Sequence, residues 1–280
     1  MIHAQQAHLH VAAQSNMGKV RQNNEDSFAV SAYRLSETDP TPSVFAILCD
    51  GIGGHKAGEV ASEMAVNRIT AWVARSDGTR PQDVIKSAFA ETNLKVLADA
   101  QSNLERHGMG ATLACAWVIG RRLYTASAGD SRIYLVRGET IHQLSIDHTW
   151  MQEAIDKGVV DPAQTNNIPN LHIIRRYLGS EKEVEPDFRL RLLASETNLE
   201  MLANQGMLLI PGDLLLLCSD GLTDMVTNDE MIKVMQREKN LNASVKALVD
   251  LANKHGGQDN ITIVMLMMPW DAEKQNWFIR

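Results

Sequence analysis

The side chains best suited to chemistry in this chain are carboxylates that stand where apolar runs begin or end. Asp50 closes the run AILCD and is followed by several glycines, and Asp220 closes LLLLCSD before another glycine. Asp130 follows a glycine between two strand-like runs, Asp259 precedes the last apolar run, and the acidic pair at 25–26 precedes an early one. A single aspartate in such a place is usually a turn residue, so the question is whether these places meet in space.

A shared cleft at the strand ends would give these carboxylates a common function. Crowded carboxylates repel and raise one another's pKa, and a divalent cation between them removes that repulsion. Oxygen ligands without Cys or His partners suit Mg²⁺ or Mn²⁺ better than Zn²⁺. The glycines beside Asp50 and Asp220 allow the backbone to approach such an ion closely. The pattern therefore favours a magnesium or manganese site over a set of separate turns.

The elements that must position these residues follow from the periodicity of the apolar residues. Helical periodicity begins at Gly58 and recurs over 84–97 and 245–252. Strand character is predicted for residues 9–13, 27–32, 43–49, 112–119, 122–128, 132–136, 188–193, 213–218 and 260–267. Helices follow the early strands, and a helix pair separates the last two strands. This order indicates an α+β fold with antiparallel sheets covered by helices, and not an alternating βαβ fold.

Composition and charge exclude several classes of function. The chain has 280 residues, of which 44% are apolar, and its net charge of -7 would repel a nucleic-acid backbone. No run approaches the ~18 apolar residues of a membrane span, and the first residues lack a signal segment. Cys49, Cys115 and Cys218 lie inside apolar runs, so we expect them to be buried and reduced in a cytoplasmic protein.

Five short motifs surround the carboxylates: R-x-N-N-E-D at 21–26, D-G-x-G-G at 50–54, G-D-S-R at 129–132, S-D-G at 219–221 and D-N at 259–260. Together they resemble the motifs of the metal-dependent protein phosphatases, the type 2C or PPM serine/threonine phosphatases, in their compact bacterial branch. Each motif alone is weak, but the set stands in the family's order, and the resemblance runs from about residue 9 to 268.

The resemblance implies a single phosphatase domain over residues 1–280, folded as a four-layer αββα sandwich of two antiparallel sheets flanked by helix pairs. Residues 158–177 fall where the family has its flap, a substrate-selecting loop. An acidic, helical insert is expected at 194–209, and a C-terminal tail at 269–280.

The resemblance also implies a binuclear centre that takes Mn²⁺ or Mg²⁺, two ions per chain. Asp50 would bridge the two ions. Asp220 and Asp259 would complete the coordination of one ion, and Glu25 with the carbonyl of Gly51 would complete that of the other.

Four further residues take supporting roles by the same resemblance. Asp26 would hold or orient water at the metals, and Asn260 would steady the ligands. Asp130 would bind a third, weaker metal that bacterial relatives carry. Arg21 would bind the phosphate of the substrate.

These roles imply hydrolysis of phosphoserine and phosphothreonine by in-line attack of a metal-bridging hydroxide. The implied partners are phosphorylated proteins and a serine/threonine kinase whose action the enzyme reverses. We expect a cytoplasmic monomer that binds neither nucleic acid nor membrane. Neither Ser131 nor Ser219 lies in a nucleophile-elbow motif, which argues against a covalent serine intermediate. Two other classes stay open: an inactive binding module with the same fold, and a phosphohydrolase of small metabolites.

Ile52 departs from many eukaryotic relatives, which carry a histidine there that is thought to protonate the leaving group. His148 is one alternative proton donor. The other interpretation makes His148 a structural residue at a helix start, with Asp147 or Thr149 as the cap.

Three other features carry two interpretations each. His55 and Lys56 either face solvent or contact the substrate. Arg175 and Arg176 either contact acidic or phosphorylated substrates or are ordinary solvated side chains. Trp277 and Phe278, in the tail, either pack on the sandwich or form a docking site for a partner.

Overall fold

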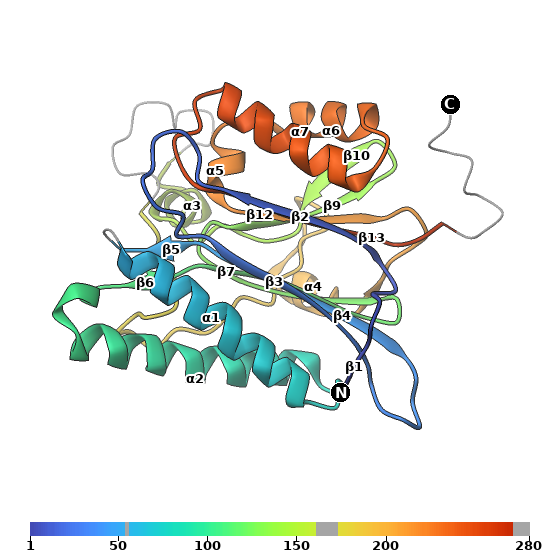
Figure 1. The fold of residues 1–280 in the computed structure, drawn as a ribbon, viewed down its shortest axis with the longest axis horizontal. Helices are drawn as coiled ribbons and strands as arrows, with labels where there is room; N and C mark the ends of the chain where they lie inside the picture. Colours follow the sequence, from blue (N-terminus) through green and yellow to red (C-terminus); the bar gives the residue numbers. More distant parts are fainter. Residues whose placement is uncertain (54–55, 161–172, 271–280) are drawn as a thin grey trace.

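The computed structural model describes residues 1–53, 56–160 and 173–270. Two antiparallel sheets face each other, with α1 and α2 along one outer face and α6 and α7 along the opposite one (Figure 1). The sheets have six and five strands, in the orders β1-β3-β4-β7-β8-β11 and β10-β9-β12-β13-β2. The predicted αββα sandwich is therefore confirmed.

The six-stranded sheet consists of β1 (Ile2–His3), β3 (Ser27–Arg34), β4 (Pro42–Cys49), β7 (Leu113–Ile119), β8 (Arg122–Ala128) and β11 (Met207–Leu208). The five-stranded sheet consists of β10 (Thr140–Gln143), β9 (Arg132–Arg137), β12 (Leu214–Cys218), β13 (Ile261–Met267) and β2 (His10–Asn16). A separate two-stranded ribbon joins β5 (Gly51–Ile52) to β6 (Gly110–Ala111).

The long helices are α1 (Lys56–Arg75), α2 (Pro81–Ser102), α6 (Asn228–Arg237) and α7 (Leu241–Lys254). The shorter ones are α3 (Trp150–Asp156), α4 (Asn198–Ala203), α5 (Asp220–Thr223) and the 3-10 turn η1 (Leu104–Arg106). Within the described ranges, no helix combines the length and the apolar character that crossing a membrane requires.

The core lies in three layers, and β4 shows why its run is apolar throughout. Phe45 and Ile47 point outward into the layer beneath α1 and α2. Val44 and Ala46 point inward, into the layer between the two sheets. Because successive strand side chains face opposite sides and both sides are covered, every position from Val44 to Cys49 needs an apolar residue.

The prediction of a strand at 188–193 is wrong. This segment forms no ladder, because its backbone groups pair one at a time with different parts of the chain. The amide of Leu190 donates to the carbonyl of Met201 at 3.0 Å, and that of Arg191 donates to Leu144 at 2.9 Å. Of the alternating apolar residues that suggested a strand, Leu190 and Leu192 pack into the layer between the sheets, whereas Phe188 packs into the layer beneath α1 and α2.

The acidic segment at 194–209 contains a shorter helix than expected. Only α4 is helical, and it begins at a capping box formed by Thr197 and Glu200. The segment then adds β11 to the edge of the six-stranded sheet, beside β8. Met201 packs inward, whereas Leu199 is 79% exposed.

Candidate metal centre

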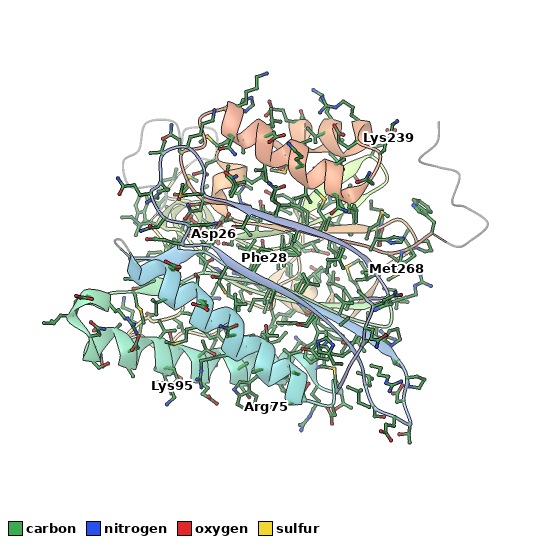
Figure 2. The ribbon with its side chains drawn as sticks, viewed as in Figure 1. Asp26, Phe28, Arg75, Lys95, Lys239 and Met268 are labelled. Atoms are coloured by element: carbon green, nitrogen blue, oxygen red, sulfur yellow. The ribbon has the colours of Figure 1, made fainter. Side chains whose placement is uncertain are left out.

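The strand register brings the predicted carboxylates to one end of the sandwich. In the six-stranded sheet Ser27 pairs with Cys49, so Asp26 and Asp50 are neighbours. In the five-stranded sheet the end of β12 lies beside the start of β13, because the amide of Ser219 donates to the carbonyl of Thr262 at 3.1 Å. Figure 2 shows Asp26 at the left-hand end of the two sheets, with Phe28 following it toward the middle.

Electrostatic interactions show that these carboxylates share one environment. Burial raises the pKa of Asp50 well above its usual range, and repulsion from Asp26, Asp220, Asp130 and Asp259 adds to the effect. Burial raises the pKa of Asp220 in the same way, followed by repulsion from its acidic neighbours. In the absence of a cation, these groups therefore resist ionisation.

The carboxylates on either side of this pair are shifted in the same direction. Burial, with repulsion from neighbouring acids, raises the pKa of Glu25 to about 7. Burial raises the pKa of Asp26 to about 6, although hydrogen bonds from Thr262 and Ser219 oppose the rise. Burial and then repulsion from Asp147 raise the pKa of Asp130 to about 6.

The donor set fits a hard divalent cation. One buried oxygen, Oδ1, accepts no hydrogen bond in each of Asp26, Asp130 and Asp220. Buried acceptors are normally satisfied, and carboxylate oxygens are the ligands that Mg²⁺ and Mn²⁺ prefer. Across the described parts of the chain, no three His, Cys, Asp or Glu side chains already stand as a metal-binding group. The fit therefore rests on donor type, unsatisfied oxygens and mutual repulsion.

Asn260 joins the two sheets at this end. Its side-chain carbonyl accepts the amide of Glu25 at 2.7 Å. Its Nδ2 donates to the carbonyls of Met17 at 3.0 Å and Asn23 at 2.9 Å. One amide side chain at the start of β13 thus fixes the loop that carries Arg21 and Glu25.

Two close approaches around the site require glycine. A Cβ on Gly58 would lie 2.6 Å from Oε2 of Glu25, so the bare start of α1 makes room for this carboxylate. A Cβ on Gly221 would lie 2.1 Å from the carbonyl oxygen of Asn260. Any side chain at either position would displace the residues next to the cluster.

Arg21 lies at the rim of the cluster. Its Nη2 donates to Oδ2 of Asp259 at 2.5 Å, and 54% of its side chain remains exposed. Pairing with Asp259 raises the pKa of the guanidinium. The exposed part of this cation can receive an oxyanion beside the carboxylates.

Asp130 lies in a turn that is held from both sides. The amide of His148 donates to the carbonyl of Gly129 at 2.8 Å. The imidazole Nδ1 lies 3.2 Å from the Gly129 amide, and Nε2 lies 2.9 Å from Oδ2 of Asp187. Thr149 caps α3 through its hydroxyl. Because His148 is buried with both ring nitrogens engaged, its placement favours the structural interpretation over proton donation.

The other predicted residues either make different contacts or lie outside the described ranges. Ile52 belongs to β5 and pairs with Gly110. Arg175 faces Glu153 at 3.8 Å, and Arg176 faces Asp187 at 3.8 Å. His55, most of the expected flap and the tail with Trp277 and Phe278 lie outside the described residues, as does the side chain of Lys56.

The supporting contacts of four hydroxyl residues at the site were not predicted from the sequence. Ser219 donates to Oδ2 of Asp26 at 2.7 Å. Ser62 donates to the carbonyl of Glu25 at 2.6 Å. Thr112 and Ser131 bond to each other at 2.7 Å. Ser219 and Ser131 stand beside predicted aspartates, which is a usable signal, whereas nothing local to Ser62 or Thr112 marks them.

Several known proteins are similar to this chain in both sequence and fold. The family model described as protein phosphatase 2C matches residues 11–154. The serine/threonine phosphatase stp of Listeria monocytogenes is 32% identical over 263 residues, which cover 92% of this chain and 95% of that protein. The protein phosphatase PhpP of Streptococcus pneumoniae is 34% identical over 265 residues, which cover 93% and 98%.

Two solved structures show the same architecture. The serine/threonine phosphatase of S. agalactiae superposes with a TM-score of 0.80 at 30% identity, covering 92% of this chain and 99% of that one. The catalytic domain of the phosphatase PstP, solved in complex with two manganese ions, superposes with a TM-score of 0.74 at 32% identity, covering 92% and 97%.

Proposed function

The chain belongs to the protein phosphatase 2C family and is a serine/threonine protein phosphatase, and we propose that it hydrolyses phosphoserine and phosphothreonine directly, without a covalent intermediate. One observation carries the mechanism. A set of buried carboxylates with raised pKa values and unsatisfied oxygens stands beside the exposed cation of Arg21. This arrangement calls for divalent cations and leaves the part of the Arg21 guanidinium that is not paired with Asp259 exposed to a phosphate.

We propose two Mn²⁺ or Mg²⁺ ions at this site, as in the PstP complex with two manganese ions. Asp50 would serve both ions. Asp220 and Asp259 would hold one ion, and Glu25 with the Gly51 carbonyl would hold the other. Asp130 would hold a third, more weakly bound ion.

When bound, the cations would lower the pKa of the water between them and supply hydroxide for in-line attack on phosphorus. Arg21 would bind two phosphate oxygens and so orient the phosphorus. Asp26, which already accepts a hydrogen bond from Ser219 at 2.7 Å, would accept one from the attacking water. Asn260 would hold Glu25 in place, because its side-chain carbonyl accepts a hydrogen bond from the backbone amide of Glu25.

The serines near the site have other partners, which supports direct hydrolysis. Ser219 is buried and bonds to Asp26, and Ser131 is buried and bonds to Thr112. Ile52 has no proton to give, and His148 is engaged with Gly129 and Asp187. The leaving serine or threonine oxygen would therefore take its proton from solvent.

The substrates would be phosphorylated proteins, and a serine/threonine kinase would supply them. We propose a single catalytic domain over 1–280, in which 158–177 act as the flap, and a cytoplasmic monomer. The three free, buried cysteines are compatible with a reducing compartment.

Hydrolysis assays test this proposal. With Mn²⁺, we expect turnover of p-nitrophenyl phosphate and of a phosphothreonine peptide, and EDTA should abolish both. Nucleotides and sugar phosphates should react at least ten times more slowly than the peptide. Asp220→Asn should fold and lose most of its activity, because it removes the negative charge of a proposed direct metal ligand. Metal-independent turnover, or full activity of Asp220→Asn, would refute the mechanism.

A further inference from the structure

We propose that Thr112 and Ser131 are positioning residues that tie the turn carrying Asp130 to the backbone of Asp50, so that cation binding at Asp130 depends on this hydroxyl pair. The proposal rests on the metal-dependent function proposed above. It concerns two hydroxyl residues that bond to the backbone of Asp50 and to each other, and to which no direct contact with substrate or cation is assigned.

Thr112 holds both backbone groups of Asp50. Its Oγ1 accepts the amide of Asp50 at 2.8 Å, and its own amide donates to the Asp50 carbonyl at 2.8 Å. Thr112 is completely buried, so no water competes for these bonds. The Asp50 backbone cannot shift unless the threonine moves with it.

Ser131 connects Thr112 to the turn between β8 and β9. Its Oγ lies 2.7 Å from Oγ1 of Thr112, and both side chains are buried. Thr112 Oγ1 already accepts one hydrogen bond, and it shares a second with the Ser131 hydroxyl. The chain from the Asp50 amide through Thr112 to Ser131 is therefore continuous.

Gly129 makes the close approach possible. Its φ is +105°, and a Cβ there would lie 2.6 Å from Cγ2 of Thr112. The turn therefore rests directly on the threonine. Asp130 stands between Gly129, which contacts Thr112 through packing, and Ser131, which contacts it through a hydrogen bond.

The hydrogen bonds of Thr112 and Ser131 oppose the electrostatic repulsion between Asp50 and Asp130. Asp50 and Asp130 repel, and this repulsion is among the causes of the raised pKa of Asp50. Two carboxylates that repel would separate if their backbones were free to move. The hydroxyl pair holds the two backbones together and so keeps the carboxylates of Asp50 and Asp130 in one cluster. Groups that hold metal ligands in this way typically change affinity by about 10- to 100-fold.

Titration of metal-free protein with Mn²⁺ by calorimetry tests the proposal without relying on activity. Thr112→Val removes the hydroxyl but keeps the methyl group that packs on Gly129. Ser131→Ala removes only the link and leaves the bond between Thr112 and Asp50. Each should weaken the most weakly bound Mn²⁺ equivalent by about tenfold. The double variant should be no weaker than Thr112→Val, because both changes remove the same connection. Thr112→Ser, which keeps the hydroxyl, should bind nearly as well as wild type.

Ser43→Ala is the matched control. Ser43 is the second residue of β4, at the end opposite Asp50, and its buried hydroxyl accepts a bond from Trp117 at 2.7 Å. This variant should lower the melting temperature and leave the Mn²⁺ isotherm unchanged. Should Thr112→Val fail to fold, Ser131→Ala carries the test alone.

Mn²⁺ isotherms equal to wild type in folded Thr112→Val and Ser131→Ala would overturn the proposal, as would equal weakening by Ser43→Ala. A wild-type protein that binds Mn²⁺ and turns over substrate keeps the proposed function in either case. A wild-type protein that binds no Mn²⁺ would overturn that function and this inference with it.

Discussion

Two buried carboxylates in this protein show that neighbours, not burial, decide the direction of a pKa shift. Asp220 is surrounded by acids, and burial with repulsion raises its pKa. Asp187 is also buried, but hydrogen bonds from His148 and Arg189 outweigh burial and hold its pKa well below the usual range. Asp187 is thus ionised and structural, whereas ionisation of Asp220 requires a positive charge nearby.

The raised pKa values give the metal-free protein a specific dependence on pH. Glu25 and Asp26 titrate near about 7 and 6 when folded, against about 4 when unfolded. The folded state therefore binds more protons between about pH 4 and 7, and its stability falls as the pH rises through this window. We expect the melting temperature in EDTA to fall from about pH 4 to 7.

Mn²⁺ should reverse this trend, because the ions bind the ionised carboxylates. The rise in melting temperature that Mn²⁺ produces should grow over the same pH range. Asp26→Asn, which removes one titrating group, should flatten the decline in EDTA. A melting temperature that is constant with pH in EDTA would contradict the shifts.

Arg21 should act on substrate binding more than on turnover. Arg21→Lys keeps the charge but loses the planar fork that binds two phosphate oxygens. A hydrogen bond to a charged group contributes about 1.5–3 kcal/mol, so kcat/KM should fall by roughly 10- to 100-fold, mainly through KM. Arg21→Ala should lose more.

Steady-state kinetics with a phosphothreonine peptide measure this effect. Arg34→Lys, at the far end of β3, is the matched control and should leave both constants unchanged. A fall in kcat with KM unaltered would assign Arg21 to the chemical step instead.

At the scale of elements, a strand's own sequence reveals whether its faces are covered, but not what it pairs with. The continuous apolar runs of β4, β7 and β12 were correctly predicted, because coverage on both sides demands apolar residues throughout. The two-residue strands β1, β5, β6 and β11 were missed, because only their partners define them. The strand predicted at 188–193 is absent because this segment has alternating apolar residues but no neighbouring strand with which to form a ladder.

The site shows the same difference between features that a segment's own sequence reveals and features that depend on a distant partner. Its carboxylates could be predicted from sequence, because each follows or precedes a strand beside glycine or asparagine. Its supporting contacts could not: the bonds of Thr112 to Asp50 and of Asn260 to Glu25 cross 62 and 235 positions of sequence. Such pairs exist only once two strands have found their register.

The ion pairs of Asp187 should stabilise the folded state by connecting separate segments of the chain. Its carboxylate binds Arg189 at 2.6 Å and His148 at 2.9 Å, with Arg176 at 3.8 Å. Asp187→Ala leaves these groups without their counter-charge, which typically costs about 3–5 kcal/mol. We expect the melting temperature to fall by roughly 10 °C.

Glu185→Ala is the matched control, two residues away, because Glu185 forms an exposed pair with Lys86. Such a pair contributes about 0–1 kcal/mol, so little change is expected. Because the Asp187 pKa is depressed, its stabilising effect is present at neutral pH and is lost as the pH falls below about 4. Thermal unfolding of both variants at neutral and acidic pH measures the difference, and equal melting temperatures would refute this role.

At the scale of the whole molecule, the two sheets each supply part of one cluster. Asp50 and Glu25 come from the six-stranded sheet, and Asp220 and Asp259 come from the five-stranded one. The layer between the sheets is apolar, so at this end the acidic cluster replaces hydrophobic contact. A cation there would bind groups from both sheets and join them.

Metal binding should therefore stabilise the whole sandwich. At a Mn²⁺ concentration of about 100 times the dissociation constant, linkage adds about 2.7 kcal/mol to the free energy of unfolding, and the melting temperature should rise by roughly 5–10 °C. Hydrogen exchange should slow beside both sheets, around Gly51 and Ile52 in the ribbon that follows β4 and around Asp259 and Asn260 just before β13. Asp220→Asn should show neither effect. Protection confined to one sheet would contradict a shared site, because a cation bound by one sheet alone leaves the other free to open.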